Sequence, residues 1–341
     1  MVTNHLKRID IWFYLILTMA LLFVAKAHTQ NVTPLRLIQR IPPQDVEGRI
    51  DHMAIDLKGQ RLFVVALGNN SLEILDLQAD KPIHRIRGLK EPQGVVYAPE
   101  LNKIFVTNGG DGSCKIFDGD SFRLIDTVKF SDDADNIRYD PRTTHIYVGY
   151  GNGALGRIDA RSGKRIGDVR LAGHPESFQL EKTGPRIFIN VPTANHIAVV
   201  DRNKLAVFAT WPLVDGRANF PMSLDETNHR LFIGCRQPPK VMVYDTKSGK
   251  EVTSLDIARD IDDIFHDAAN KRIYASSGEG FVNVFQQEGV DHYIVLAKIP
   301  TAAGARTSLF VPEQAHLYLA VPHRGDQQAE IRVYAVEHER R

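Results

Sequence analysis

The chain is poor in cysteine, with only Cys114 and Cys235 among its 341 residues. The two lie far apart in the sequence, and neither belongs to a CxxC or CxxCH motif. The sequence therefore lacks a disulfide framework, a cysteine zinc site and an attachment site for c-type haem. We expect both cysteines to be free thiols.

Several catalytic motifs are also missing. No HExxH or GxSxG occurs, which excludes the zincin site and the hydrolase nucleophile elbow. "SGK" occurs twice, at 162–164 and 248–250, but without the first glycine of GxxxxGK, so we reject nucleotide binding there. The 42 basic and 41 acidic residues nearly balance, and nothing in that total indicates nucleic acid as a partner.

The N-terminus differs from the rest of the chain. Lys7 and Arg8 precede the apolar run Ile11–Ala25, and Ala25 and Ala27 have the spacing of a cleavage site. A helix of this run would span about 22 Å, less than the roughly 30 Å of a bilayer core. We predict a signal peptide over 1–27, a mature domain over 28–341 without a membrane span, and a periplasmic or secreted location. The alternative is an uncleaved anchor, which would also leave the domain outside the cytoplasm.

An aliphatic–aromatic pair recurs every 41 to 44 residues, within a short strand-like run. Such a period, in units built of short strands, is typical of β-propeller blades. The seven runs are "RLFVVA" (Leu62), "KIFVTN" (Ile104), "HIYVGY" (Ile146), "RIFINV" (Ile187), "RLFIGC" (Leu231), "RIYASS" (Ile273) and "HLYLAV" (Leu317).

Each unit contains four strand-like runs, but the last unit is one strand short. The segment "PLRLIQRIP" (34–42) resembles the outer strand "HYIVLAKIP" (292–300), so we expect it to complete the last blade. The predicted fold is all-β: a seven-bladed β-propeller of four-stranded antiparallel blades. Its repeats start near residues 48, 91, 133, 173, 216, 259 and 304.

Aspartate often ends the third strand of a unit, where its side chain can bond the backbone of a turn. Gly163 and Gly249 stand where such turns need a left-handed residue. We interpret these aspartates as structural: Asp76, Asp118, Asp159, Asp201 and Asp245.

The stretch "IFVTNGG" (104–110), in a repeat whose third strand ends in Asp, resembles the YVTN-repeat β-propellers. Phe105 replaces the tyrosine of that name, while Tyr147 keeps it without the Thr-Asn pair. The resemblance covers all seven repeats and implies the propeller fold. It also implies export, because many members are exported bacterial proteins, but no shared catalytic motif. The following "NGGDGS" is interpreted as a turn.

In each repeat we count back eleven positions from the aliphatic residue of the recurring pair, for example from Leu62 to Asp51. The residues found in this way, and the residue after each of them, should meet at one mouth of the central channel. Several are acidic, and converging carboxylates need a cation, an arginine or raised pKa values. We predict ligand binding by Arg49, Asp51, His52, Gln93, Asp135, Asn136, Glu176, Asn219, Asp262, Asp263 and Arg306. The metal candidates are Asp51, Asp135, Glu176 and Asp262.

No cofactor is required, but a divalent cation such as Ca²⁺ would suit these oxygens, and His52 would favour a transition metal. Alternatively, each acid caps its own strand or pairs with a neighbour.

Three functions remain open. The first is an exported binding or scaffold propeller that takes a small molecule or a protein at the channel mouth. The second is a lactonase-like hydrolase, since some seven-bladed relatives open sugar lactones. In it, His52 or His174 would be the base and Arg306 would bind the acid group of the substrate. The third is an electron-transfer accessory or metal carrier, against which the missing haem and cysteine motifs count.

Overall fold

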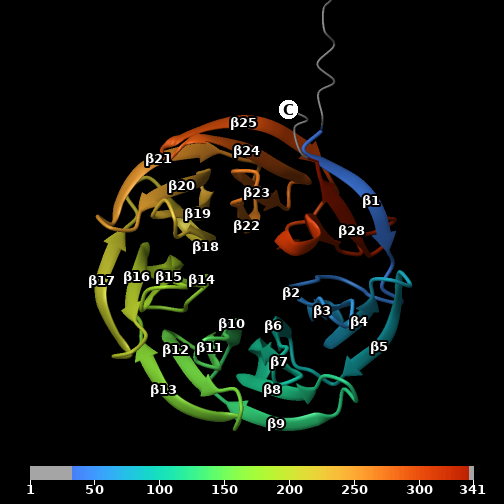
Figure 1. Cartoon of the computed structure of the whole chain (residues 1–341). Coiled ribbons are helices and arrows are strands. Elements are labelled where there is room, and N and C mark those ends of the chain that lie inside the picture. Colours follow the sequence, from blue (N-terminus) through green and yellow to red (C-terminus); the bar gives the residue numbers. More distant parts are fainter. Residues whose placement is uncertain (1–32, 338–341) are drawn as a thin grey trace, which may run out of the picture. The chain divides into compact units, whose positions relative to one another are not determined.

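Seven four-stranded antiparallel sheets stand around a central opening (Figure 1). This computed structural model describes residues 33–337, so the predicted signal peptide over 1–27 lies outside the described residues. All seven sheets belong to a single compact unit of the chain. In the described part of the chain, no helix is long and apolar enough to cross a membrane.

The strands follow the repeats, and each blade runs from the channel outward. Blade 1 has β2 (Met53–Asp56), β3 (Arg61–Ala66), β4 (Ser71–Asp76) and β5 (Lys81–Arg87). Blade 2 has β6 (Pro92–Ala98), β7 (Lys103–Asn108), β8 (Ser113–Asp118) and β9 (Leu124–Lys129). Blade 3 has β10 (Ala134–Asp140), β11 (His145–Tyr150), β12 (Ala154–Asp159) and β13 (Lys164–Arg170). Blade 4 has β14 (Phe178–Leu180), β15 (Arg186–Val191), β16 (His196–Asp201) and β17 (Ala206–Pro212).

The remaining blades are built in the same way. Blade 5 has β18 (Arg217–Asp225), β19 (Arg230–Gln237), β20 (Pro239–Asp245) and β21 (Lys250–Asp256). Blade 6 has β22 (Ile261–Asp267), β23 (Arg272–Ser277), β24 (Phe281–Gly289) and β25 (His292–Pro300). Blade 7 has β26 (Ser308–Val311), β27 (His316–Val321) and β28 (Glu330–Val336), and β1 (Leu35–Ile41) is its outer strand. Three short 3₁₀ turns lie between second and third strands, at Leu67–Asn69, Gly109–Asp111 and Pro192–Ala194, and a fourth, Pro312–Gln314, lies between the first and second strands of blade 7.

The N-terminal strand closes the ring as predicted. β1 pairs antiparallel with β28, from Leu35 opposite Val336 to Ile41 opposite Ile331. Each blade buries one face against the next, so the second strands are buried along almost their whole length, including polar residues such as Thr107 and Asn108 in β7. Phe105, for example, is fully buried in a cluster that joins blades 2 and 3.

The turn aspartates are confirmed as structural. Asp76 Oδ1 accepts the backbone N–H groups of Gln78 and Ala79 at 2.8 and 2.9 Å, and the four other aspartates accept N–H groups in the turns that follow them. Gly163 and Gly249 have φ of 70° and 69°, the left-handed conformation expected of them. Both cysteines are free and buried, also as expected.

A β-bulge interrupts every outer strand at the same place in the blade. One extra residue in the outer strand lies between two paired neighbours, which twists the open edge and discourages pairing with another sheet. The extra residues are Ile38, Ile83, Ile125, Ile166, Phe208, Val252 and Leu296.

The blade interfaces should dominate stability. We expect Phe105→Ala to lower the free energy of unfolding by about 3–5 kcal/mol, because it leaves a cavity between two blades. Phe208→Ala is the control, since that side chain is 60% exposed on the outer bulge of blade 4, and it should cost under about 1 kcal/mol. Chemical denaturation followed by circular dichroism measures both. Equal losses would contradict the assignment of stability to the interfaces.

Candidate functional site

A second set of β-bulges builds the channel mouth. The Val65 carbonyl accepts the N–H of Asp51, while the Val65 N–H donates to the His52 carbonyl. Asp51 and His52 therefore both lie opposite the single residue Val65, which is the pattern of a β-bulge. Asn190 faces Glu176 and Ser177 in the same way. β6, β10, β18 and β22 shift register at corresponding points. Because a bulge re-aims side chains, the predicted mouth residues share a special backbone geometry in successive blades.

Arginines neutralise the acids on one side of the mouth. Asp262 binds Arg236 Nη2 at 2.5 Å and Arg306 Nε at 3.0 Å. Arg306 Nη1 also binds Asp260 at 2.7 Å. We call Arg236, Asp260, Asp262 and Arg306 the arginine network. Its carboxylates need no further cation to offset their charge.

Asp51 is compensated separately. Its carboxylate lies 2.7 Å from Arg49 Nη2 and 2.9 Å from His52 Nδ1. Burial alone would lower the pKa of His52, but the hydrogen bond and charge of Asp51 raise it to about 10. At neutral pH His52 therefore carries its proton, which suits a proton donor rather than the base of a hydrolase.

Across the mouth, Asp135, His174 and Glu176 form a carboxylate–histidine cluster. Each offers one ligand atom, and these atoms all lie within 4.8 Å of one another. No lysine or arginine within residues 33–337 forms an ion pair with Asp135 or Glu176. Burial, and then the charge of Asp135, raise the pKa of Glu176 to about 8.

The ring of His174 is held in one orientation. Its Nδ1 lies 2.7 Å from the Gly151 carbonyl, to which an Nδ1–H group donates. Nε2 then faces Asp135 Oδ2 at 3.6 Å. Ligating histidines are commonly oriented by such a backbone hydrogen bond. The 3.6 Å between His174 Nε2 and Asp135 Oδ2 is also close to the roughly 3.4 Å expected between two ligand atoms of one tetrahedral metal ion.

The predicted residues thus divide between two kinds of environment. Of the four metal candidates, Asp135 and Glu176 lie together, whereas Asp51 and Asp262 pair with arginines. Gln93 Nε2 donates to Asp133, and buried Asn219 donates to Asn190 of the adjacent blade.

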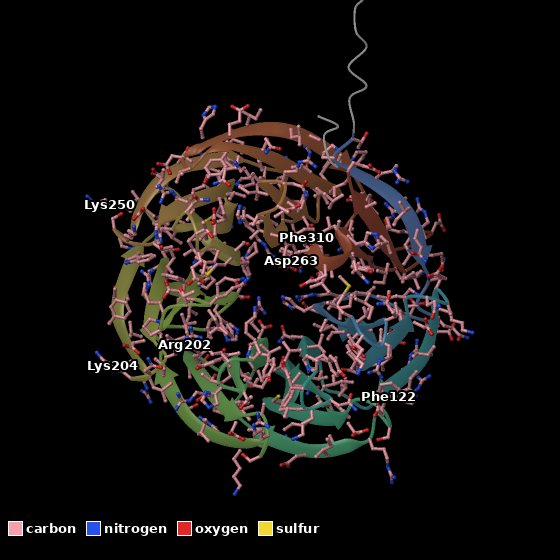
Figure 2. All side chains as sticks on the ribbon, viewed as in Figure 1. Phe122, Arg202, Lys204, Lys250, Asp263 and Phe310 are labelled. Atoms are coloured by element: carbon pink, nitrogen blue, oxygen red, sulfur yellow. The ribbon has the colours of Figure 1, made fainter. Side chains whose placement is uncertain are left out.

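Asp263 lies on the wall of the central opening (Figure 2) and accepts the Ser308 N–H at 2.7 Å. Burial raises its pKa to about 7.

Sequence reasoning missed Asp133, Arg236 and Asp260. Asp133 Oδ2 lies 3.6 Å from His174 Nδ1. Arg236 comes from the end of β19 and stacks on Phe220, with its guanidinium carbon 3.8 Å from the ring centre. All three lie outside the repeat positions used to find the mouth. The run of acids from Asp132 to Asp135 was the available signal for Asp133.

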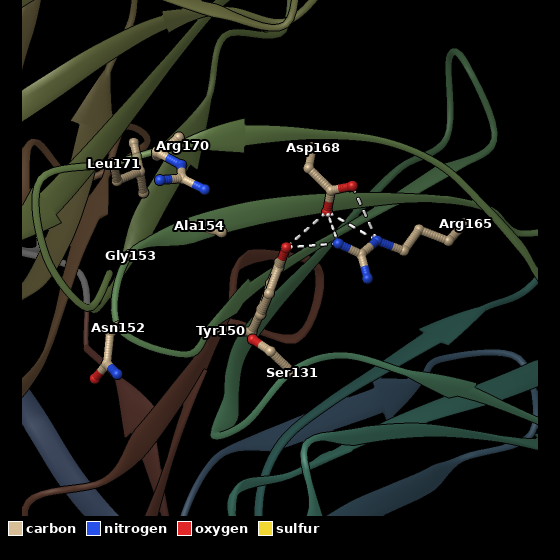
Figure 3. Close-up of a pocket in the computed structure, with 9 residues that line it drawn as sticks. All are labelled: Ser131, Tyr150, Asn152, Gly153, Ala154, Arg165, Asp168, Arg170 and Leu171. Carbon is tan, nitrogen blue, oxygen red and sulfur yellow. Dashed lines mark hydrogen bonds and ion pairs between the residues drawn. The ribbon is translucent and has the colours of Figure 1, made fainter.

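A separate pocket of about 600 Å³ lies where β12 begins and β13 ends (Figure 3). Arg165 Nε donates to both oxygens of Asp168 at 2.9 and 3.0 Å, and Arg165 Nη2 lies 2.6 Å from the Tyr150 hydroxyl. Arg165, Asp168 and Tyr150 thus use their hydrogen-bonding groups on one another, which leaves fewer of these groups free to bind a ligand.

Comparisons with known proteins identify the fold but no family. No family model and no curated protein matches the sequence. A chain of the mitotic checkpoint complex has a TM-score of 0.76 at 11% identity, covering 88% of this chain and 92% of that one. U3-55K has a TM-score of 0.76 at 10% identity (88% and 98% covered). Hydrazine synthase of Kuenenia stuttgartiensis has 0.74 at 15% identity (86% and 98%). At such identities the likeness shows the seven-bladed fold alone.

Removing the charge of Glu176 should stabilise the metal-free protein. Because its pKa is raised from 4.5 to about 8, the folded state loses stability as pH rises through this range. We expect Glu176→Gln to gain about 1–2 kcal/mol at about pH 9 and almost nothing at about pH 5. Melting temperatures in EDTA measure this, with exposed Glu313→Gln as the control. A gain that is equal at both pH values would contradict the assigned repulsion.

Proposed function

We propose that this protein is a ligand-binding propeller that holds a divalent cation at its channel mouth. The ligands are one carboxylate oxygen each from Asp135 and Glu176, and His174 Nε2. The observation that carries the proposal is the orientation of His174, whose Nδ1 is engaged by Gly151 while Nε2 faces Asp135.

The donor set favours a transition metal over Ca²⁺. Imidazole nitrogen suits Zn²⁺ and similar ions, whereas Ca²⁺ prefers six to eight oxygens. Three protein ligands would leave a coordination position open toward the channel, as catalytic zinc sites do. A small polar molecule or a protein side chain could complete the coordination. This position is the basis of the proposed binding function.

A hydrolase is the second candidate, supported by the same open position. A cation there would lower the pKa of a bound water, and protonated His52 could supply a proton to a leaving group. In this version His174 is a ligand, not a base. Arg306, already paired with Asp260 and Asp262, would have to exchange partners to bind an acidic substrate.

We also propose that the chain belongs with the YVTN-repeat propellers. The contacts of Thr107 and Asn108 support this, because they give the Thr-Asn pair a structural role. Thr107 Oγ1 accepts the Gly94 N–H and donates to the Asp135 carbonyl, which joins blades 2 and 3. Asn108 Oδ1 accepts the Lys90 N–H.

Export through residues 1–27 is part of the proposal. N-terminal sequencing of the secreted or periplasmic protein should begin at His28. A protein that stays with the membrane and keeps Met1 would indicate the uncleaved anchor.

Cation binding should be visible as thermal stabilisation. Zn²⁺ or Mn²⁺, added after EDTA treatment, should raise the melting temperature of the purified chain by several degrees, since ligands of the native state stabilise by mass action. Ca²⁺ should have less effect. Asp135→Asn should remove the response.

Asp256→Asn is the control, because that side chain is 92% exposed and far from the cluster in sequence; it should respond like wild type. A wild-type chain that responds to none of the ions, or an Asp135→Asn chain that still responds fully, would refute the cation site.

A further inference from the structure

The channel contains a second region, a cavity of about 530 Å³ that extends from His52 and Asp263 toward Tyr139 and Pro312. We call it the channel chamber. Tyr139 lies near the end of its inner strand, so the chamber runs away from the mouth along the channel. Its volume is in the range of small-molecule sites. Figure 2 shows Asp263 and Phe310, two lining residues, around the central opening.

Arg138 lines this chamber without a carboxylate partner. Nη1 donates to the Ile137 carbonyl at 2.8 Å, and Nη2 to Ser177 Oγ at 3.3 Å. No acid in the described chain lies at ion-pair distance from it. By contrast, Arg202 binds Asp140 at 2.8 Å. A guanidinium has five N–H donors, so most of those on Arg138 have no protein acceptor.

Burial lowers the pKa of Arg138, and the charges of Asp263 and then Asp135 oppose this, but neither carboxylate lies at ion-pair distance from it. Asp263 is the carboxylate on its wall, but one of its oxygens accepts the Ser308 N–H, and the neighbouring charge of His52 offsets it. His266, also on the wall, lies 3.6 Å from Asp225. His52 pairs with Asp51 at 2.9 Å, so Arg138 is the cation on this wall that has no carboxylate of the described residues at ion-pair distance.

Much of the remaining wall is apolar, including Val96, Phe265, Leu309 and Phe310. A guanidinium without a carboxylate partner, in a cavity whose wall also has several apolar side chains, matches an amphiphilic anion. The planar fork of arginine binds a carboxylate through two parallel hydrogen bonds, and apolar side chains bury the rest of the molecule.

We propose that the channel chamber binds a small organic carboxylate, with Arg138 as its anion-binding residue and Phe265 and Leu309 against its apolar part. The site is distinct from the carboxylate–histidine cluster and requires no metal. Binding in EDTA therefore tests it separately from the proposed cation site.

Isothermal titration calorimetry of the full chain in EDTA tests the proposal with two matched probe pairs, benzoate with benzamide and propionate with propionamide. We expect at least one carboxylate to bind, and to bind about tenfold or more tightly than its neutral amide, because the amide cannot form the charged pair. Arg138→Gln should weaken carboxylate binding about tenfold or more. Arg138→Lys should bind with intermediate affinity, since it keeps the charge without the fork.

Arg170→Gln is the control, an exposed arginine in the pocket of Figure 3, and it should bind the probes like wild type. If Arg138→Gln does not fold, the proposal is tested by comparing carboxylate binding with amide binding, on wild type and on Arg138→Lys. A preference for the carboxylate that is weaker in Arg138→Lys would support the proposal, and an equal affinity for acid and amide would overturn it. Absence of carboxylate binding to wild type would mean that water alone occupies the chamber. Equal binding by wild type and Arg138→Gln, or of acid and amide, would also overturn the proposal.

Discussion

Closure of the ring is the constraint on which the rest of the molecule depends. Each blade buries its apolar faces only against its neighbours, so the first and seventh blades have to meet. Their shared cluster contains Leu62 and Met53 from one side and Tyr318 and Val333 from the other. The pairing of β1 with β28 joins the two ends of the described chain in one sheet. Since the mouth residues come from several blades, the arrangement of the ring determines which of them meet.

Bulges serve opposite purposes at the two edges of a blade. In the outer strand, the extra residue disturbs an edge that would otherwise pair with another sheet. In the inner strand, it breaks the alternation of side chains, so that adjacent residues such as Asp51 and His52 contact each other at 2.9 Å. A regular strand would have placed them on opposite faces. The outer bulge protects the fold, and the inner bulge assembles the polar mouth.

Repetition determined what could be predicted from the sequence. The period, the closing strand and the turn aspartates occur at matching positions, and all were confirmed. Counting within the repeat also selected residues, such as Asp51 and His52, that lie at the inner bulges, although the bulges themselves were not predicted. The ion pairs of the acids could not be predicted, because the partner residues do not stand at a position that recurs from repeat to repeat. Arg236 extends from the end of β19, and Asp260 precedes β22. Arg138 looked like an ordinary strand residue, since its missing partner is a property of the folded channel.

The distribution of charge around the mouth argues for function over strand capping. Acids that only capped strands could all be compensated as Asp51 and Asp262 are, by arginines at 2.5 to 3.0 Å. Asp135 and Glu176 have no arginine of the described chain at ion-pair distance. His174 lies 3.6 Å from Asp135, but burial and the charge of Asp135 still raise the pKa of Glu176, which lowers the stability of the folded state at high pH. The apolar blade interfaces supply enough stability to tolerate this. Unfavourable local interactions of this kind concentrate at binding sites, where a ligand removes them. The unpaired guanidinium of Arg138 presents the same situation with the opposite charge.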